Sequence, residues 1–323
     1  MEKRATHHVF EHLVSQCREL NAIPVAVAFP IDEVSLEGAV GAANQGLILP
    51  VLVGPPSEIR TMAQALRIDL SGYRIVEAST PEIAAERAVA LCRSGECKAL
   101  MKGSLHTDVL MHEVTKPDTG LRESRRMSHV FVMDVPNYSK MLLITDSAIN
   151  IYPSLEEKVD IVQNAIDLAQ VLGVRHPKVA ILSAVETVTP RISSTVEAAA
   201  LCKMAERGQI RGGVVDGPLA FDNAVSLPAA KIKHLVSPVA GQADVLVVPD
   251  METGNMLAKQ LEYLADADSA GIVVGARVPI VLTSRADSIK ARLASCAVMA
   301  MLVHKQEHAA GAKGQSGEKV ETR

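Results

Sequence analysis

Hydroxyl side chains and an arginine lie together just before the last apolar helix that the sequence predicts. Residues 283–288, Thr-Ser-Arg-Ala-Asp-Ser, follow a short predicted strand and precede a helical pattern that runs to about Val303. Free N–H groups at a helix N-terminus bind anions, and an arginine adds a fork of donors suited to phosphate. The segment therefore indicates a phosphate or phosphoryl-ester site. The alternative is an ordinary capped helix that carries a surface arginine.

Polar residues also follow several of the other predicted strands. In open α/β sheets, ligands bind beyond the carboxyl ends of the strands, so these residues are candidates for contacting a substrate. Aspartate, asparagine and glycine are also common in turns and helix caps, so each of them alone has a purely structural explanation. The candidates are Lys102, Gly103, Asp146, Asn150, Asp216, Gly217, Pro218, Asp250 and Asn255.

The motifs of several enzyme classes are missing. No GxGxxG follows a predicted strand, which disfavours a nicotinamide site, and no GxxxxGK[ST] phosphate-binding loop occurs. GxSxG and HExxH are also absent, and no cysteine–histidine cluster has metal-ligand spacing, so we predict no metal ion. A phosphate-binding α/β protein without these motifs must use another architecture.

Composition excludes further functions. The 323 residues carry a formal net charge of −4 and only 2% aromatic residues, so we expect no nucleic-acid partner. No apolar run reaches the roughly 18 residues of a membrane span, and the N-terminus lacks the pattern of a signal peptide. The five cysteines form no CxxC pair. We therefore expect reduced thiols in a cytoplasmic protein, none of them a nucleophile.

Short apolar runs that alternate with amphipathic segments must position the candidate residues. Expected helix starts are Asp32, Ser57 and Thr80, and Ser154 with Glu157 forms a capping box. Such alternation predicts an α/β architecture with a mostly parallel sheet. The expected strands span residues 23–29, 47–53, 98–101, 178–183, 213–216, 244–249, 271–274 and 279–283.

One connection departs from this alternation. The strand-like runs 128–135 and 141–145 are separated by only five residues. So short a connection is too short for a crossover and predicts an antiparallel hairpin. We expect a domain junction close to this hairpin.

Several short segments along the chain together form a recognisable series. They are Met101-Lys102-Gly103, Gly120-Leu121-Arg122, Ser128-His129-Val130, and residues 145–150, 215–224, 237–244, 248–250, 254–255 and 282–288. Taken in this order, the segments resemble the phosphate acetyl/butyryl transferase family, the phosphotransacylases. The resemblance covers residues 20–303 and is closest to butyryltransferase-type members. It extends to the transacylase half of longer proteins that carry an enoyl-CoA hydratase module, a module that we do not expect in this chain.

The resemblance implies a fold and an assembly. It implies two α/β domains of the isocitrate/isopropylmalate dehydrogenase type, with the active site in the cleft between them, and a homodimer. The first domain would comprise residues 1–128 plus 273–304, and the second, inserted domain residues 129–272. Residues 305–323 are rich in Gly, Lys, Glu and Gln and are expected to form a disordered tail.

The reaction that the resemblance implies interconverts acyl-CoA plus phosphate with acyl phosphate plus CoA, the acyl group being acetyl or butyryl. The CoA thiolate attacks directly, so we expect neither a covalent enzyme intermediate nor a permanently bound cofactor. Carried over from the family, Arg285 binds the phosphoryl group and Ser284 donates to the carbonyl or leaving oxygen. Ala291 occupies the position of the catalytic aspartate in acetyltransferase-type members. Asp287 on the same loop is then the expected base, with helix capping as its alternative role.

Two other hypotheses remain open. A decarboxylating dehydrogenase of the same architecture is disfavoured, because none of the matched residues belongs to a nicotinamide site. A non-catalytic protein that binds CoA or acyl phosphate is suggested by Ala291. The sequence alone sets neither the acyl-chain preference nor the physiological direction.

Overall fold

The described chain, residues 9–284 and 287–317 of a computed structural model, forms two units. We call residues 11–122 and 277–317 the terminal unit, and residues 9–10 and 123–276 the middle unit. The chain changes from one unit to the other after Arg122 and again at Arg277. For comparison, the sequence predicts these changes after residues 128 and 272.

The terminal unit is built on five parallel strands in the order β3-β2-β1-β4-β11. The apolar runs that predict strands are buried in it, as expected for a parallel sheet that helices cover. The strands are β1 (Ile23–Ala28), β2 (Ile48–Gly54), β3 (Arg74–Glu77), β4 (Ala99–Lys102) and β11 (Ile280–Val281).

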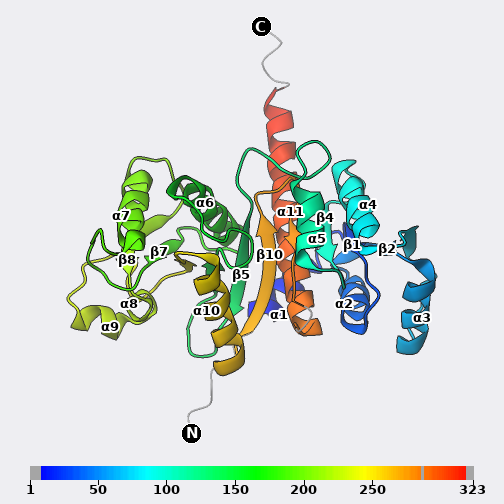
Figure 1. The fold of residues 1–323 in the computed structure, drawn as a ribbon, viewed down its shortest axis with the longest axis horizontal. Coiled ribbons are helices and arrows are strands. Elements are labelled where there is room, and N and C mark those ends of the chain that lie inside the picture. The colour runs from blue at the N-terminus through cyan, green and yellow to red at the C-terminus, as the bar shows by residue number, and fades with distance from the viewer. Residues whose placement is uncertain (1–8, 285–286, 318–323) are drawn as a thin grey trace. The chain divides into compact units, whose positions relative to one another are not determined.

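Two helices of the terminal unit begin at N-cap residues that the sequence predicts. Asp32 accepts a hydrogen bond from the N–H of Ser35, and Thr80 accepts one from the N–H of Ile83. The last helix of this unit packs against its second helix and against β11. Both helices, α2 and α11, are labelled in Figure 1. The helices are α1 (Val9–Cys17), α2 (Glu33–Asn44), α3 (Pro56–Leu66), α4 (Pro81–Arg93), α5 (Thr107–Thr115) and α11 (Ile289–Gly317).

The middle unit holds six strands in the order β10-β5-β6-β9-β7-β8. β5 pairs antiparallel with β10 and with β6, which confirms the predicted hairpin, and the remaining pairs are parallel. Mixed α/β structure with mostly parallel pairing is therefore confirmed. The strands are β5 (Ser128–Asp134), β6 (Leu142–Thr145), β7 (Lys178–Leu182), β8 (Val214–Leu219), β9 (Val245–Val247) and β10 (Asp268–Val274).

Helices cover the sheet of the middle unit. One core cluster joins alternate strand residues such as Leu142 and Ile144 to Ala224, Ala230 and Ala258 of three helices. The capping box of Ser154 and Glu157 is present at the start of another. The helices are α6 (Leu155–Val171), α7 (Ser193–Glu206), α8 (Phe221–Val225), α9 (Leu227–Ile232) and α10 (Met251–Leu264).

Three local features differ from the sequence prediction. The sequence prediction does not include β3, because Arg74–Glu77 has only two apolar residues and forms a half-buried strand at the end of the strand order. Helix α3 begins at Pro56 with Pro55 as N-cap, rather than with Ser57, because proline suits the first helical position. Helix α11 continues through residues 305–317, where a disordered tail is expected. Alanine, lysine and glutamine in that stretch favour a helix.

Among the helices in the described part of the chain, none combines the length and the hydropathy that a membrane crossing requires.

Candidate active site

In the terminal unit, two of the predicted loops leave neighbouring parallel strands. β11 pairs with β4 in the register Ile280 to Leu100 and Val281 to Met101. The turn at Lys102 and Gly103 and the loop at Ser284 therefore start from the same edge of the sheet. The structure thus brings together two of the candidate segments that the sequence places about 180 residues apart.

Lys102 and Gly103 form a tight, buried turn after β4. The Lys102 side chain is only 3% exposed, and its Nζ donates to the carbonyl oxygens of Gly103 (3.3 Å) and Leu105 (3.1 Å). The N–H of Gly103 donates to the oxygen of Ala28 at 2.9 Å, and a Cβ at this glycine would lie 2.3 Å from that oxygen. The turn therefore requires glycine, and the lysine ammonium stabilises it.

The Ser284 backbone is held by a reciprocal pair of hydrogen bonds. Its N–H donates to Oδ2 of Asp287 at 2.7 Å, and its carbonyl accepts from the N–H of Asp287 at 3.2 Å. The side chain of Ser284 is exposed. Helix capping, the alternative role for Asp287, falls to Ser288, whose hydroxyl accepts from the N–H of Ala291 at 3.1 Å. Arg285 lies outside the described residues.

A residue that the sequence does not single out lies beneath this loop. Arg292 on α11 is 1% exposed, and its guanidinium donates to the carbonyls of Ser284 (3.1 Å) and Lys102 (3.5 Å). Burial lowers the pKa of Arg292, while the negative charges of Asp32 and Asp287 counteract that effect. No sequence pattern distinguishes this arginine from one on a helix surface.

In the middle unit, the Asp146 carboxylate is the centre of the loop that follows β6. It is only 3% exposed, and its Oδ1 accepts from the N–H groups of Ala148 (2.9 Å) and Ile149 (3.0 Å). Its Oδ2 accepts from the backbone N–H of Asn150 at 3.2 Å and from the Asn150 side chain. Burial raises the pKa of Asp146, and these donors oppose the rise.

Asn150 connects the Asp146 loop to the segment before β5. Its Nδ2 donates to the carbonyl of Met127 at 2.9 Å, and its Oδ1 accepts from Nε of Arg126 at 2.7 Å. The Arg126 guanidinium is half-exposed and also pairs with Glu157 at 3.0 Å. A cationic group therefore stands at the surface beside the Asp146 loop.

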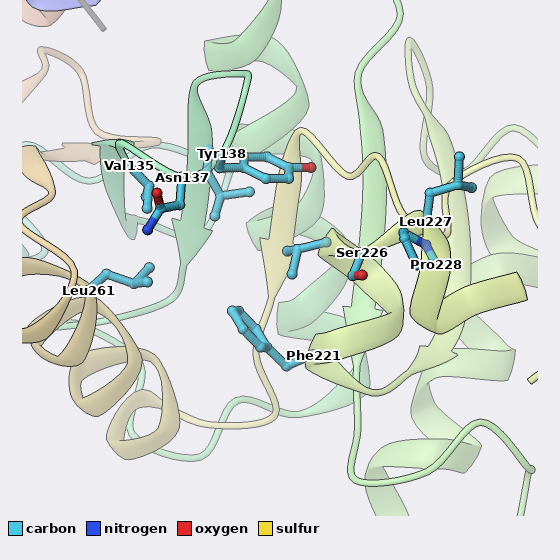
Figure 2. A pocket seen from close by; sticks show the side chains of 10 residues that line it. Val135, Asn137, Tyr138, Phe221, Ser226, Leu227, Pro228 and Leu261 are labelled. Carbon is cyan, nitrogen blue, oxygen red and sulfur yellow. The ribbon is translucent and has the colours of Figure 1, made fainter. Parts of the chain in front are cut away.

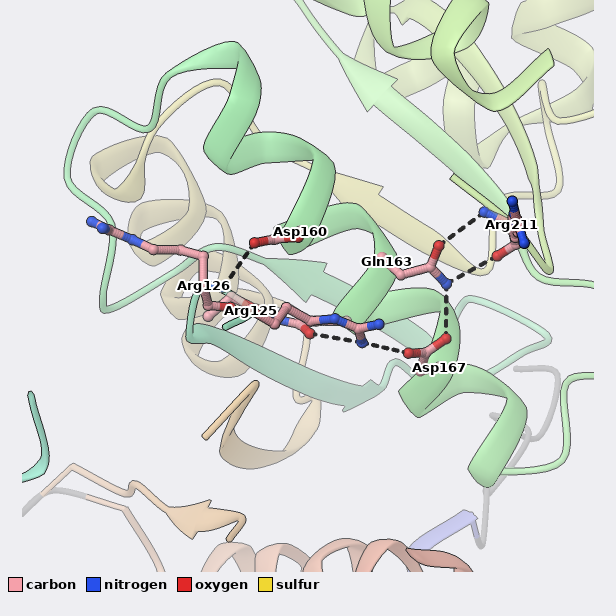
Figure 3. A network of polar contacts seen from close by, with 8 residues as sticks. Arg125, Arg126, Asp160, Gln163, Asp167 and Arg211 are labelled. Atoms are coloured by element: carbon pink, nitrogen blue, oxygen red, sulfur yellow. Dashed lines mark hydrogen bonds and ion pairs between the residues drawn. The ribbon is translucent and has the colours of Figure 1, made fainter. Parts of the chain in front are cut away.

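Helix α6 holds the segment that carries Arg126. The N–H of Arg126 donates to Asp160 at 2.8 Å, and Arg125 pairs with Asp167 at 2.6 Å, as Figure 3 shows. Asn164 of the same helix donates to the carbonyl of Arg126 at 2.9 Å. The position of Arg126 is thus set by backbone contacts as well as by its side chain.

Helix α10 packs against the Asp146 loop from the next parallel strand, β9. Asp250 caps this helix, and its Oδ1 accepts from both the N–H and the hydroxyl of Thr253 at 2.8 Å. Asn255 donates to the carbonyl of Ser147 at 3.4 Å. Both candidates therefore have structural roles that bring the N-terminal turn of α10 to the loop.

The third candidate group of the middle unit lies apart. Asp216 accepts a hydrogen bond from the N–H of Gly217 at 2.9 Å, and the Gly217–Pro218 peptide is cis. β8, which carries these residues, is separated from β6 by β9 and β7. At about 4.8 Å per strand this spacing is roughly 14 Å. Asp216 therefore belongs to a different part of the sheet edge from Asp146.

Burial opposes ionisation of all five cysteine thiols. Burial raises the pKa of Cys202, beside Gly217, to about 12, and that of Cys296 also to about 12. For Cys17 and Cys97 burial raises the pKa to about 11, and Cys92 is raised as well. Within the described residues, no group of three or more His, Cys, Asp or Glu side chains is arranged to hold a metal ion.

A pocket of about 390 Å³ in the middle unit is lined by none of the candidate residues named above. Tyr138 and Phe221 face it from the hairpin loop and from α8, as Figure 2 shows, and Leu142 and Leu261 also line it. The Tyr138 hydroxyl donates to the carbonyl of Ala243 at 2.6 Å, and burial raises its pKa to about 12. The lining described here therefore offers apolar contact but no acid or base for chemistry near neutral pH.

The comparisons with known proteins concern a family, its sequence relatives and solved structures. The family described as Phosphate acetyl/butaryl transferase matches residues 83–300. A phosphate acetyltransferase of Rhizobium meliloti is 61% identical over 292 residues, which cover 90% of this chain and 92% of that protein. A phosphate butyryltransferase of Clostridium acetobutylicum is 40% identical over 293 residues, which cover 91% of this chain and 97% of that protein. The solved structure of a branched-chain phosphotransacylase from Enterococcus faecalis V583 has a TM-score of 0.75 and 32% identity, covering 87% of this chain and 99% of that one.

Proposed function

Because the chain belongs to the phosphate acetyl/butyryl transferase family and is a phosphate acyltransferase, we propose that it exchanges an acyl group between phosphate and the thiol of coenzyme A. The sulfur of CoA attacks the acyl carbon of an acyl phosphate, the bond from that carbon to the phosphate oxygen breaks, and phosphate leaves. The thiol proton passes to a base. CoA is then a substrate, and no permanently bound cofactor takes part.

The loop after β11 is the proposed phosphate site. The observation that carries this proposal is the Ser284 backbone, which is held between Asp287 and Arg292 while the serine side chain, in the loop before α11, is exposed. A hydroxyl donor on a backbone held in this way can stabilise charge that develops in the transition state with little reorganisation. Ser284 donates to the carbonyl or leaving oxygen, and Arg285 binds the phosphoryl group.

We assign the role of general base to Asp287. Its carboxylate lies on the same loop and accepts the N–H of Ser284, which places it next to the serine that we assign to the phosphate site. The position seven residues after Ser284 is alanine, so the residue that acetyltransferase-type relatives use is missing. Asp287 therefore both orients Ser284 and accepts the proton from the thiol.

The remaining candidate residues contribute to substrate binding mainly by shaping loops. Lys102 and Gly103 form the turn beside Ser284 in the terminal unit. Asp146, Asn150, Asp250 and Asn255 hold the loop after β6 against α10. Asp216, Gly217 and Pro218 form a separate contact region after β8. The half-exposed Arg126 beside Asn150 adds a cation that suits the phosphates of CoA.

We propose acetyl as the preferred acyl group. The phosphate acetyltransferase of Rhizobium meliloti is 61% identical to this chain, whereas the phosphate butyryltransferase of Clostridium acetobutylicum is 40% identical. The dehydrogenase and the non-catalytic binding protein are not favoured, because the relatives are named as phosphate acyltransferases. Association of two copies stays a prediction, for which light scattering of the purified protein gives the mass.

The test is direct. The purified protein is mixed with CoA and acetyl, propionyl or butyryl phosphate, and the thioester is followed by its ultraviolet absorbance. We expect acyl-CoA to form with the highest kcat/KM for the acetyl compound. No thioester from any of the three would sink the proposed reaction, and a higher kcat/KM for butyryl phosphate would overturn the acyl preference only.

A further inference from the structure

Arg292 is the largest fully buried side chain in the described part of the chain. It sits in the first turns of α11, where its N–H donates to the carbonyl of Ser288. An arginine is charged at any ordinary pH, and a buried charge is costly unless its donors are used. Its Nε is also buried and has no hydrogen-bond partner among the described residues. The fold therefore retains a costly group at this place.

The contacts of Arg292 are backbone carbonyls of the two loops proposed to form the phosphate site. One amino group donates to the oxygen of Ser284 at 3.1 Å, and the other lies 3.5 Å from the oxygen of Lys102. The Ser284 oxygen belongs to the peptide that joins Ser284 to Arg285. The Lys102 oxygen belongs to the peptide that leads into the Gly103 turn. A single planar group thus ties the ends of β4 and β11 together.

Helix α2 leaves room for this side chain. Gly38 lies opposite Arg292, and a Cβ there would come within 2.6 Å of Cδ and 3.3 Å of Cβ of the arginine. Gly41, three residues later in the same helix, has only Leu293 near its missing Cβ, at 3.8 Å. Glycine inside a helix is unfavourable relative to alanine, so the space at Gly38 is kept at a cost. The helix therefore makes room for the arginine at Gly38, whereas Gly41 does not contact it.

We propose that Arg292 is the positioning residue of the phosphate site: its guanidinium fixes the carbonyl of Ser284 against the Lys102–Gly103 turn, so that Ser284 meets the phosphoryl group in one geometry. This inference rests on the role proposed above for Ser284. Arg292 touches no substrate in this scheme. Its effect on kinetics passes through the loop that it holds.

The test uses acetyl-CoA and inorganic phosphate with four variants of the full chain, Arg292→Met, Arg292→Lys, Gly38→Ala and Gly41→Ala. Hydrogen bonds from charged donors predict a fall in kcat/KM for phosphate of about 10- to 100-fold in Arg292→Met. The KM for acetyl-CoA should stay within about twofold of wild type. Arg292→Lys should recover part of the loss, because lysine keeps the charge but lacks the planar fork.

Gly38→Ala tests the same geometry with the arginine still present. Its methyl group displaces the guanidinium, so we expect the same kinetic defect as in Arg292→Met. A fifth variant that combines Gly38→Ala with Arg292→Met should have a kcat/KM for phosphate no lower than that of Arg292→Met alone. Gly41→Ala is the matched control, with the same change in the same helix and kinetics like wild type. If Arg292→Met fails to fold, the comparison of Gly38→Ala with Gly41→Ala decides.

Arg285→Met, measured alongside, distinguishes a failure of the proposed phosphate site from a failure of the positioning role of Arg292. If it leaves kcat and the KM for phosphate unchanged, the proposed phosphate site is wrong. If it is impaired while folded Arg292→Met and Gly38→Ala retain wild-type constants per folded molecule, only the positioning role is overturned. A lower melting temperature of the Arg292 variants without a change in kcat or KM would likewise overturn only the positioning role.

Discussion

Gly254 is the point at which α10 approaches the Asp146 loop, and a methyl group added there should reduce both stability and activity. A Cβ at Gly254 would lie 2.5 Å from the backbone oxygen of Asp146 and 2.9 Å from Oγ of Ser147 and Cγ2 of Val248. Overpacking costs about 1–3 kcal/mol. Alanine regains about 0.5–1 kcal/mol over glycine inside a helix. We therefore expect Gly254→Ala to lower the free energy of unfolding by about 0.5–2 kcal/mol.

Urea unfolding followed by circular dichroism measures this change, and Gly41→Ala is again the control. The space at Gly41 accepts a methyl group, so that variant should gain about 0.5–1 kcal/mol. Because the clash moves α10 against the loop that Asp146 organises, Gly254→Ala should also lower kcat/KM in the thioester assay. A Gly254→Ala protein at least as stable as wild type would refute the packing argument.

Three further changes test the proposed chemistry and the electrostatics. Ser284→Ala should lower kcat by about 10²–10³-fold, as expected for an oxyanion donor, and a change smaller than about threefold would remove that role. Asp287→Asn retains an oxygen that can accept the N–H of Ser284 but loses the base, so kcat with CoA and acyl phosphate should fall by about 10²-fold or more, with a pH–rate profile that rises as the CoA thiol ionises unaided. An unchanged profile would contradict the assignment. Burial raises the pKa of Tyr138 to about 12. A raised pKa means stability that is present below the unfolded value near 10 and lost as pH rises through the folded value. The chain has four tyrosines and no tryptophan, so ionisation of the tyrosines can be followed by difference absorbance as the pH is raised. The absorbance change at the highest pH should be missing in Tyr138→Phe.

Local signals in the sequence predict most of the elements. Thr80 before Pro81, and Ser154 with Glu157, mark helix starts that the structure contains, because a cap needs only residues within one turn. β3 escapes prediction because Arg74–Glu77 is too short and too polar to be recognised at a sheet edge. The N-cap of α3 is Pro55, two residues before the predicted Ser57, because Pro56 suits the first helical position, where no N–H is needed.

Candidate site residues are predictable to the extent that they follow strands. Asp146 and Asn150 come after a buried strand, and the structure joins them by hydrogen bonds within the same loop. Arg292 could not be predicted, because its burial depends on Gly38, which lies 254 residues earlier in the chain, and on carbonyls that carry no sequence information. The spatial separation of Asp216 from Asp146 likewise follows from strand order, which sequence spacing does not encode.

The central claim is that the loop after β11 binds the phosphoryl group. The most direct test is the KM for phosphate of Arg285→Met, measured with acetyl-CoA as the second substrate. Loss of a charged donor to phosphate predicts a rise of at least about tenfold, while the KM for acetyl-CoA stays within about twofold of wild type. A KM for phosphate equal to that of the wild-type protein would contradict the proposed site.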